Sequence, residues 1–277
     1  MDTYHILNFH EIFSENAFCL SQRLGVELVK DFQPKKDQTY IIFGSHNQAA
    51  TLHSIQVSNP YFKYIVINTE PPQSNVLRNK YYLSLMKNNI VWDYSDLSRK
   101  YLESLGIRVY SMYSPEFVYA PVETPRTIDI LFVGSRNDRR DAIYKRLLER
   151  YPDKKIVFEM DWKHSNQGEM KKLLQSADTV LNIPYYNSKI LETHRINAAL
   201  ACGCNVVSLY SGHEETDKLY EPYVHFCNDL YEYFDSEEML PVHMTEQKLK
   251  YPHLISTLLP LVKHNKWIIS QLIKTKN

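Results

Sequence analysis

The sequence lacks the features that would assign it at once to a specialised class of protein. Glycine occurs only 7 times in 277 residues, and neither G-x-G-x-x-G nor G-x-x-x-x-G-K-[ST] is present. The common glycine-rich loops for dinucleotides and nucleoside triphosphates are therefore excluded. Cys19, Cys202, Cys204 and Cys227 are too few and too scattered for a disulfide framework. We expect a protein of a reducing compartment.

An excess of charge and long apolar runs are missing as well. Lys+Arg and Asp+Glu both number 32, so no net field favours nucleic acid or an anionic membrane. No run approaches the roughly 18 apolar residues that span a bilayer. The start, MDTYHILNFHEIF, lacks the basic and apolar regions of a signal peptide. We expect a soluble cytoplasmic protein (in the host cytoplasm if the chain is viral) with no transmembrane segment and no nucleic-acid partner.

What the sequence does contain is an alternation of short apolar runs with longer amphipathic ones, the pattern of βα units around parallel sheets. In the first half, we expect a helix from Ser14 to Phe32 and a later helix that ends at Gly106 in a left-handed conformation. The expected strands of this half are Tyr4–Phe9, Thr39–Phe43, Tyr64–Asn68, Asn89–Asp93 and Arg108–Tyr113.

Residues 114–126, SPEFVYAPVETPR, contain three of the 13 prolines and show no helical period, which is typical of a linker. The pattern then restarts, with expected strands at Thr127–Val133, Lys155–Met160, Thr179–Ile183, Val206–Leu209 and Tyr223–Cys227. We therefore expect an N-terminal domain at 1–113, the linker at 114–126, a C-terminal domain at 127–250 and a closing amphipathic helix within 251–277.

Two successive sheets of this kind predict an α/β protein with two Rossmann-like domains that face each other across a cleft. Ligands of open parallel sheets bind outside the carboxyl ends of the strands. The residues that directly follow the strands are therefore the candidates for a site. In the first half, these candidates are His10, His46 and Glu70.

The stretch from Ser188 to Ser211 is the most distinctive of the second half. It begins with charged and polar residues and runs through a small-residue helix end into an apolar strand. A helix N-terminus at a sheet edge, with Arg195 and Lys189 beside it, forms an anion site. The Gly134–Arg140 loop opens another helix in the same way. The alternative for Arg195 is a structural ion pair with Glu192, three positions earlier.

Three segments of the second half carry a family resemblance: IDILFVGS followed by RNDRR, MKKLLQSADTVLNIP, and LETHRINAALACGCNVVS. In this order they resemble the donor-binding domain of GT-B fold glycosyltransferases, especially the glycosyltransferase group 1 proteins of bacteria and large DNA viruses. The resemblance spans roughly residues 127–227. The first half shares the strand–helix rhythm, including VWDYS. Two family features are missing, because Ala199 replaces the second glutamate of a pair begun by Glu192 and no Gly-Gly loop follows the first strand.

The resemblance implies hexosyl or pentosyl transfer from a nucleotide-diphosphate sugar, with UDP- or GDP-sugars expected first. The acceptor, a glycan, lipid or protein-linked sugar, would bind the first domain. Trp267 would anchor the last helix as it crosses back onto that domain. Arg139 and Tyr186 are secondary candidates for the donor site, whose main candidates are Gly134, Ser135, Arg136, Arg140, Tyr185, Lys189, Glu192, Thr193, His194 and Arg195.

The chemistry of such a transfer needs a charge partner for the leaving diphosphate. The chain has no D-x-D or H-E-x-x-H pattern, and Cys202-Gly203-Cys204 has the wrong spacing for a metal. We therefore expect a metal-independent enzyme without a cofactor, in which fixed cations stabilise the diphosphate. If the transfer inverts the anomeric carbon, His10, His46 or Glu70 is the candidate base.

Other functions stay open at this point. One is a nucleotide-sugar epimerase of the same fold, which would turn over the donor without an acceptor. Another is a non-catalytic two-domain ligand-binding protein, or a scaffold that has lost activity, since the glutamate pair is incomplete.

Overall fold

The computed structural model describes residues 3–30, 32–35, 38–111, 125–160, 167–187 and 190–235. The described chain falls into two compact units, one that runs to Ser111 and one that begins at Pro125. Lys189, Trp267, the expected closing helix and most of the expected linker lie outside the described residues. The domain boundaries expected from the sequence therefore stay a prediction.

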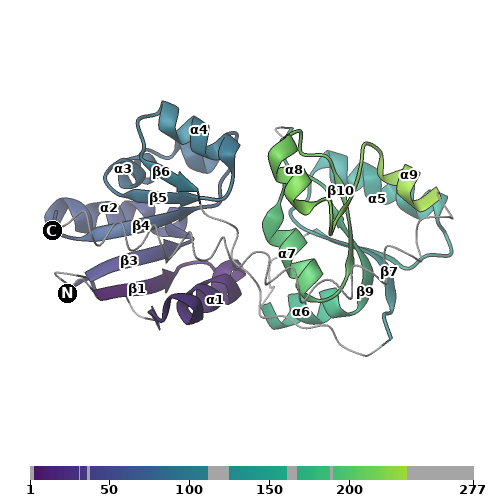
Figure 1. The fold of residues 1–277 in the computed structure, drawn as a ribbon, viewed down its shortest axis with the longest axis horizontal. Helices are drawn as coiled ribbons and strands as arrows, with labels where there is room; N and C mark the ends of the chain where they lie inside the picture. Colours follow the sequence, from purple (N-terminus) through teal and green to yellow (C-terminus); the bar gives the residue numbers. More distant parts are fainter. Residues whose placement is uncertain are drawn as a thin grey trace. The chain divides into compact units, whose positions relative to one another are not determined.

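The first unit is built on a sheet whose described strands are all parallel, in the order β2-β1-β3-β4-β5-β6 (Figure 1). Those strands are β1 (Thr3–Asn8), β2 (Glu27–Val29), β3 (Gln38–Phe43), β4 (Lys63–Asn68), β5 (Ile90–Asp93) and β6 (Val109–Ser111). The segments between them form the helices α1 (Ser14–Leu24), α2 (Ala49–Ser58), α3 (Lys80–Lys87) and α4 (Asp96–Ser104). Short 3-10 turns precede three of these helices, namely η1 (Glu11–Phe13), η2 (Ser45–Gln48) and η3 (Asn75–Arg78).

Both faces of this sheet are apolar, because successive side chains of a strand point to opposite faces. Leu7 pairs with Ile42, and both join the cluster covered by α2, α3 and α4. Ile6 pairs with Ile41, and both join the cluster on the side of α1. Burial on both faces explains why these strands read as unbroken apolar runs.

The helix expected from Ser14 to Phe32 is too long, and that prediction is wrong. The helix α1 ends at Leu24, because Gly25 adopts a left-handed conformation with φ 63° and its N–H bonds to the Ser21 carbonyl. The chain then forms the edge strand β2, which pairs in parallel with β1. Leu28 keeps the helical spacing by coincidence, so the glycine was the decisive signal. By contrast, Gly106 ends a helix in a left-handed conformation, as predicted.

The second unit is built on a sheet with the order β11-β10-β9-β7-β8, again parallel throughout the described residues. Its strands are β7 (Ile128–Val133), β8 (Ile156–Glu159), β9 (Ala177–Asn182), β10 (Asn205–Leu209) and β11 (His225–Cys227). Its helices are α5 (Asp138–Arg150), α6 (Gln167–Gln175), α7 (Thr193–Ala201), α8 (Glu214–Tyr220) and α9 (Leu230–Asp235).

Helices cover both faces of this sheet too. On one face, α6, α7 and α8 pack over Leu131 and Val180, and on the other, α5 and α9 pack over Phe132 and Leu181 (Figure 1). The small residues of α7 let that helix lie close to the strands, and Ala199 is fully buried in the contact. The predicted fold class, α/β with two Rossmann-like units, is confirmed.

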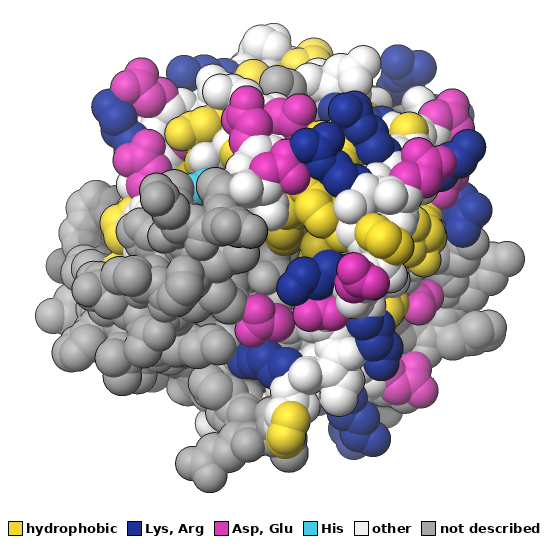
Figure 2. Space-filling model, turned by 90° about the vertical axis from the view of Figure 1, so that its right-hand side faces the viewer, with side chains coloured by type: hydrophobic (Ala, Val, Ile, Leu, Met, Phe, Trp, Pro, Cys, Tyr) yellow, Lys and Arg dark blue, Asp and Glu magenta, His cyan; other side chains and the backbone are white. Residues whose placement is uncertain are grey.

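The outer surface carries both signs of charge. Figure 2 shows Lys and Arg side chains interspersed with Asp and Glu side chains over the described part of the face in view. Among the described residues, no helix combines the length and the apolar character that a membrane crossing requires.

Candidate functional site

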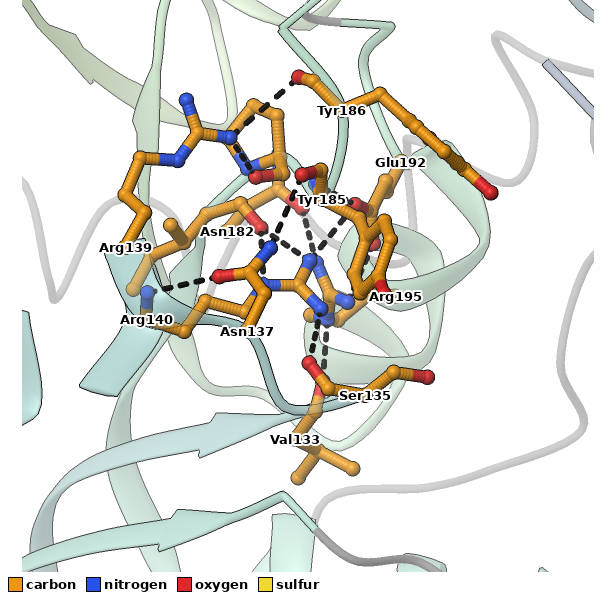
Figure 3. A network of polar contacts seen from close by, with 12 residues as sticks. Val133, Ser135, Asn137, Arg139, Arg140, Asn182, Tyr185, Tyr186, Glu192 and Arg195 are labelled. Carbon is orange, nitrogen blue, oxygen red and sulfur yellow. Dashed lines mark hydrogen bonds and ion pairs between the residues drawn. The ribbon is translucent and has the colours of Figure 1, made fainter. Parts of the chain in front are cut away.

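The second sheet has its topological switch point between β7 and β9. The strand β8 lies on one side of β7 and β9 on the other. The chain therefore crosses one face of the sheet after β7 and the opposite face after β9. Open α/β sheets bind their ligands in the crevice at such a point, outside the carboxyl ends of the strands. The residues that follow the two strands here are Gly134–Arg140 and Ile183–Tyr186, and their side chains meet the start of α7 (Figure 3).

Arg140 is the buried centre of this site. Its side chain comes from the first turn of α5 and is only 1% exposed. Nε donates to the Ile183 carbonyl at 3.1 Å and Nη1 to the Ser135 carbonyl at 2.7 Å. Nη2 donates to Glu192 Oε1 at 2.9 Å. A single guanidinium therefore ties the end of β9, the loop after β7 and the start of α7 together.

Arg195 lies beside Arg140 and reaches back from α7 to the same two strands. Its Nε donates to the carbonyl of Val133, the last residue of β7, at 2.6 Å. Its Nη1 donates to the amide oxygen of Asn182, the last residue of β9, at 2.7 Å. Nη2 forms an ion pair with Glu192 Oε2. The ion pair named from the sequence as the structural alternative is therefore present.

Glu192 is the carboxylate that both arginines contact. Its Oε1 accepts from Arg140 and also from the backbone N–H of Tyr185, each at 2.9 Å, and its Oε2 faces Arg195. The two guanidiniums lie over the ring of Phe132, at 4.7 Å for Arg140 and 4.9 Å for Arg195 from the ring centroid. These contacts fix both cations in place, because each has hydrogen bonds and an aromatic face.

Gly134, the first residue after β7, leaves room for the side chains of both arginines. A Cβ atom at this position would lie 2.7 Å from Arg195 Nη2, 2.9 Å from the Phe132 ring and 3.1 Å from Arg140 Nη1. The guanidiniums thus occupy the space that a side chain would need. Because Gly134 has no side chain, the loop can pass close to the two guanidiniums.

The electrostatics of this site favour an anion. Two guanidiniums share one carboxylate, and Arg139 adds a further positive charge nearby. The pKa of Arg140 is lowered to about 10, first by burial and then by the neighbouring charge of Arg195, while Glu192 opposes both. A pair of like charges with one counter-ion gains from a bound anion such as a phosphate.

Several other predicted donor residues surround this centre. Arg139 donates to the Pro184 carbonyl and, at 3.4 Å, to that of Tyr186. The Tyr185 ring is 38% exposed and lies over Arg140, with its centroid 5.2 Å from the guanidinium. Tyr185 is therefore placed to contact a ligand with its free face.

The remaining predicted donor residues lie at the margin of the site or outside it. Thr193 is buried and His194 is half-buried at the start of α7, while Ser135 is exposed. The side chain of Arg136 is exposed and pairs with Asp141 at 3.8 Å. Lys189 lies outside the described residues.

Two asparagines belong to the site although the sequence did not single them out. Asn182 holds Arg195 and also donates to Ser208 Oγ at 2.9 Å. Asn137 caps α5 by accepting from the Arg140 N–H at 2.9 Å, and it donates to the Tyr185 carbonyl at 3.0 Å. Asn182 was detectable in principle, because it is a polar residue at the carboxyl end of an apolar strand.

The first sheet has its own switch point, between β1 and β3. The strand β2 lies on one side of β1 and β3 on the other. The loops that follow β1 and β3 approach each other closely at Gly44, which has φ 63°. A Cβ there would lie 2.7 Å from His10 Cβ, so a glycine is required for steric as well as conformational reasons.

The structure brings the three predicted catalytic candidates together at this switch point. The His10 and His46 rings lie 6.2 Å apart, centroid to centroid, and His46 Nδ1 lies 3.9 Å from Glu70 Oε1. Ser74 donates to Glu70 Oε2 at 2.6 Å and holds the carboxylate in place. His10 has a second role, because its Nδ1 accepts from the Ile12 N–H and caps η1.

The state of His46 suits proton transfer. Burial lowers the pKa of His46, Glu70 raises it and His10 lowers it. The imidazole is therefore neutral at neutral pH, with Nδ1 turned toward the carboxylate. A hydrogen bond from Nδ1 to this carboxylate would leave Nε2 to accept a proton; at 3.9 Å the two groups lie beyond hydrogen-bond length. Of the three candidates, His46 with Glu70 has the geometry of a base.

Metal ligands are not gathered in the part of the chain that the structure describes. Within those residues, no three His, Cys, Asp or Glu side chains come close enough to hold a metal ion. Cys202 and Cys204 are buried thiols, as expected of small packing residues.

Comparisons with known proteins find similarity in structure and not in sequence. No family model matches the chain, and no curated protein matches it. OtsA, a trehalose-6-phosphate synthase, matches with a TM-score of 0.54 and 12% identity over 95% of this chain and 82% of that chain. A structure from E. coli, trehalose-6-phosphate bound with UDP-2-fluoro glucose, matches with a TM-score of 0.53 and 11% identity over 95% and 77%.

A third match is a mutant of S. aureus TarM in complex with fondaparinux, alpha-GlcNAc-glycerol and UDP. Its TM-score is 0.51 at 14% identity, over 89% of this chain and 58% of that chain. The chain spans 58% to 60% of the length of the TarM and GtfA/B structures that it matches. The two parallel sheets and these matches lead to one conclusion: the chain has the GT-B fold of glycosyltransferases.

Proposed function

We propose that this protein is a glycosyltransferase that moves a hexosyl or pentosyl group from a nucleotide-diphosphate sugar to a sugar-bearing acceptor. The observation that carries the proposal is the arginine pair around Glu192 at the switch point of the second sheet. Two of the matched structures hold UDP or a UDP-sugar, by their descriptions. A cationic, partly buried site at that point of a GT-B fold suits the diphosphate of such a donor.

The donor end of the reaction would use Arg195 directly. Its contacts with Val133, Asn182 and Glu192 engage three N–H groups of a guanidinium that carries five. The side chain is 12% exposed, and we propose that its two remaining N–H groups meet a ligand oxygen. As the glycosidic bond breaks, charge builds up on the diphosphate, and a fixed cation stabilises that charge without reorganising. Arg140 would act from behind, by holding Glu192 and the loop after β7.

The acceptor end would use His46 and Glu70 of the first unit. In an inverting transfer, His46 Nε2 would take the proton of the attacking acceptor hydroxyl, and Glu70 would stabilise the imidazolium that forms. The oxygen of the acceptor would then bond to the anomeric carbon, and the nucleoside diphosphate would leave. His10 lies beside this pair and is proposed as a contact for the acceptor.

The finer features of the reaction belong to the same proposal. The donor would be a UDP- or GDP-sugar, and the acceptor a glycan, lipid or protein-linked sugar. The reaction would need no metal and no cofactor, because the guanidiniums supply the charge that a metal would otherwise bring. The work would take place in the cytoplasm.

A thermal-shift panel with UDP, GDP, dTDP and CMP and their sugars, in EDTA and in magnesium, tests the donor class. A ligand at 100 times its dissociation constant adds about 2.7 kcal/mol to the stability. We expect one nucleoside diphosphate to raise the Tm in EDTA. Transfer to an acceptor mixture, followed by release of the same diphosphate, would complete the test. Donor turnover without an acceptor would indicate an epimerase, and a shift without turnover a binding protein.

Arg195→Ala tests the residue that would meet the diphosphate. We expect the binding of that diphosphate to weaken by roughly 1.5–3 kcal/mol, the range for a hydrogen bond to a charged group. The variant also loses contacts to two strand ends, so its melting curve has to be measured alongside. An unchanged affinity in a folded variant would remove Arg195 from the site.

A further inference from the structure

A buried amide and a buried carboxyl lie directly behind the His46–Glu70 pair. Asn68 is the last residue of β4 and Asp93 the last residue of β5, and the two are register partners in the sheet. Asn68 is 0% exposed and Asp93 2% exposed. Asn68 Nδ2 donates to Asp93 Oδ2 at 2.6 Å.

Asn68 uses its whole side-chain amide to hold the turn that carries Glu70. Nδ2 also donates to the Glu70 carbonyl at 3.0 Å, and Oδ1 accepts from the Glu70 N–H at 3.3 Å. The Tyr82 hydroxyl donates to the same Oδ1 at 3.0 Å. Two donated and two accepted bonds fill the capacity of an asparagine amide. The orientation of the amide is therefore fixed, and the backbone of Glu70 is fixed with it on both sides.

Asp93 determines which way the Asn68 amide faces. When Asp93 is ionised it only accepts hydrogen bonds, so it requires the NH₂ end of the amide to point toward it. Its other oxygen, Oδ1, accepts from the Ser95 N–H at 2.8 Å. The pKa of Asp93 is raised to about 7, because the effect of burial outweighs the opposing effect of the bonds from Asn68 and Ser95. A carboxyl in this position is costly to bury, and an apolar pair would pack at lower cost.

We propose that Asn68, held by Asp93, is a positioning residue of the reaction: it sets the direction of Glu70 and, through Glu70, the orientation of His46. This inference rests on the proposed sugar transfer and assigns two residues to it that touch neither donor nor acceptor. The carboxylate of Glu70 lies 3.9 Å from His46 Nδ1, beyond hydrogen-bond length, so a small movement of the turn decides whether the two groups form a hydrogen bond. The unfavourable free energy of burying Asp93 is then tolerated because this carboxyl serves catalysis.

The experiment compares Asn68→Ala with Asn89→Ala in sugar transfer by the full chain. Asn89 directly precedes β5, so it lies at the amino ends of the strands, whereas Asn68 lies at their carboxyl ends. Asn89 also makes four hydrogen bonds, two with Gln56, one with the Tyr64 N–H and one with the Leu85 carbonyl. We expect Asn68→Ala to lower kcat roughly 10- to 100-fold, the effect of a reacting group misplaced by about 1 Å. In this variant the KM for the nucleotide sugar should stay at the wild-type value. The control variant Asn89→Ala should keep the wild-type kcat.

Three results would overturn the inference. One is an unchanged kcat in Asn68→Ala, and another is an equal loss of kcat in Asn89→Ala, which would indicate general damage to the sheet. If the wild-type chain transfers no sugar at all, the proposed function and this inference are refuted together. A wild type that transfers sugar, with Asn68→Ala equally active, refutes the inference alone.

A double variant, Asn68→Asp with Asp93→Asn, keeps the test decisive if Asn68→Ala does not fold. It restores a carboxylate–amide pair between the two strands, so the Tm should return toward that of the wild type. The new carboxylate at position 68 has no N–H to donate to the Glu70 carbonyl. We therefore expect kcat to stay low, and a restored kcat would contradict the role assigned to Asn68.

Discussion

The charge of Glu192 should stabilise the second unit, and Glu192→Gln isolates this effect. The amide keeps the shape of the side chain and one oxygen for the Tyr185 N–H; it removes the negative charge and turns an NH₂ group toward Arg195 in place of an accepting oxygen. Arg140, which is 1% exposed, would then lie beside Arg195 without the carboxylate that both contact. Removing one partner of a buried ion pair is strongly destabilising, because it leaves a buried charge uncompensated.

The size of this effect follows from the contacts. Two unit charges about 4 Å apart attract each other by about 4 kcal/mol at an effective dielectric constant of 20. Glu192 is 26% exposed, so solvent screens part of this attraction, and the amide keeps part of the hydrogen bonding. We expect a loss of about 2 kcal/mol. In a unit of this size, that corresponds to a fall in Tm of roughly 4–8 °C.

Melting curves of Glu192→Gln with and without pyrophosphate measure both the loss and its cause. Pyrophosphate should raise the Tm of the variant more than that of the wild type, because an added anion replaces the missing charge. Glu103→Gln is the matched control: Glu103 pairs with Arg99 on the surface of α4 at 3.0 Å and is 41% exposed. Such a pair contributes less than about 1 kcal/mol. A Glu192→Gln variant that melts like the control would refute the idea that this carboxylate holds two buried cations together.

Three further outcomes are expected. Gly134→Ala should weaken diphosphate binding and lower the stability by about 1–3 kcal/mol, because the added Cβ would lie 2.7 Å from Arg195 Nη2; isothermal titration and melting curves check both. Gly44→Ala should destabilise the first unit by about 1–3 kcal/mol in urea unfolding, because it strains a residue at φ 63° and pushes against His10. Burial raises the pKa of Asp93 from 3.8 to about 7, so the folded chain holds a proton there that the unfolded chain releases. The unfolding free energy should therefore fall as the pH rises from about 4 to about 7, and Asp93→Asn should remove this slope in urea melts.

Much of the fold was predictable from local sequence alone. The strand β4 reads as YIVIN and β7 as IDILFV, and such apolar runs between polar turns mark the strands of a doubly covered sheet. The strands predicted at Thr39–Phe43 and Tyr64–Asn68 agree with β3 and β4 to within one residue. The edge strand β2 was missed, because the apolar spacing of a helix continues past Gly25 although the helix itself ends there. A three-residue strand is too short to produce a period of its own.

The site was predictable only in part, because its contacts join residues that are far apart in the sequence. Arg140 was named from the loop after a strand and Glu192 from the charged start of the stretch from Ser188 to Ser211, yet their ion pair spans 52 positions. The pair Asn68 and Asp93 depends on the register between two parallel strands, which a single sequence does not reveal. Sequence patterns thus locate the residues at the carboxyl ends of the strands, whereas only the fold shows which of these residues contact each other.

The shared carboxylate of Glu192 has a consequence for how this protein can change over evolutionary time. Arg140 and Arg195 both depend on Glu192, so a single exchange that alters the charge of any one of the three residues leaves the charges unmatched. A swap of charge between positions 140 and 192 fails too, because it would place two arginines against each other at 192 and 195. In divergent relatives, these three positions should therefore be kept or lost as a set, and they should covary with the presence of a glycine at position 134.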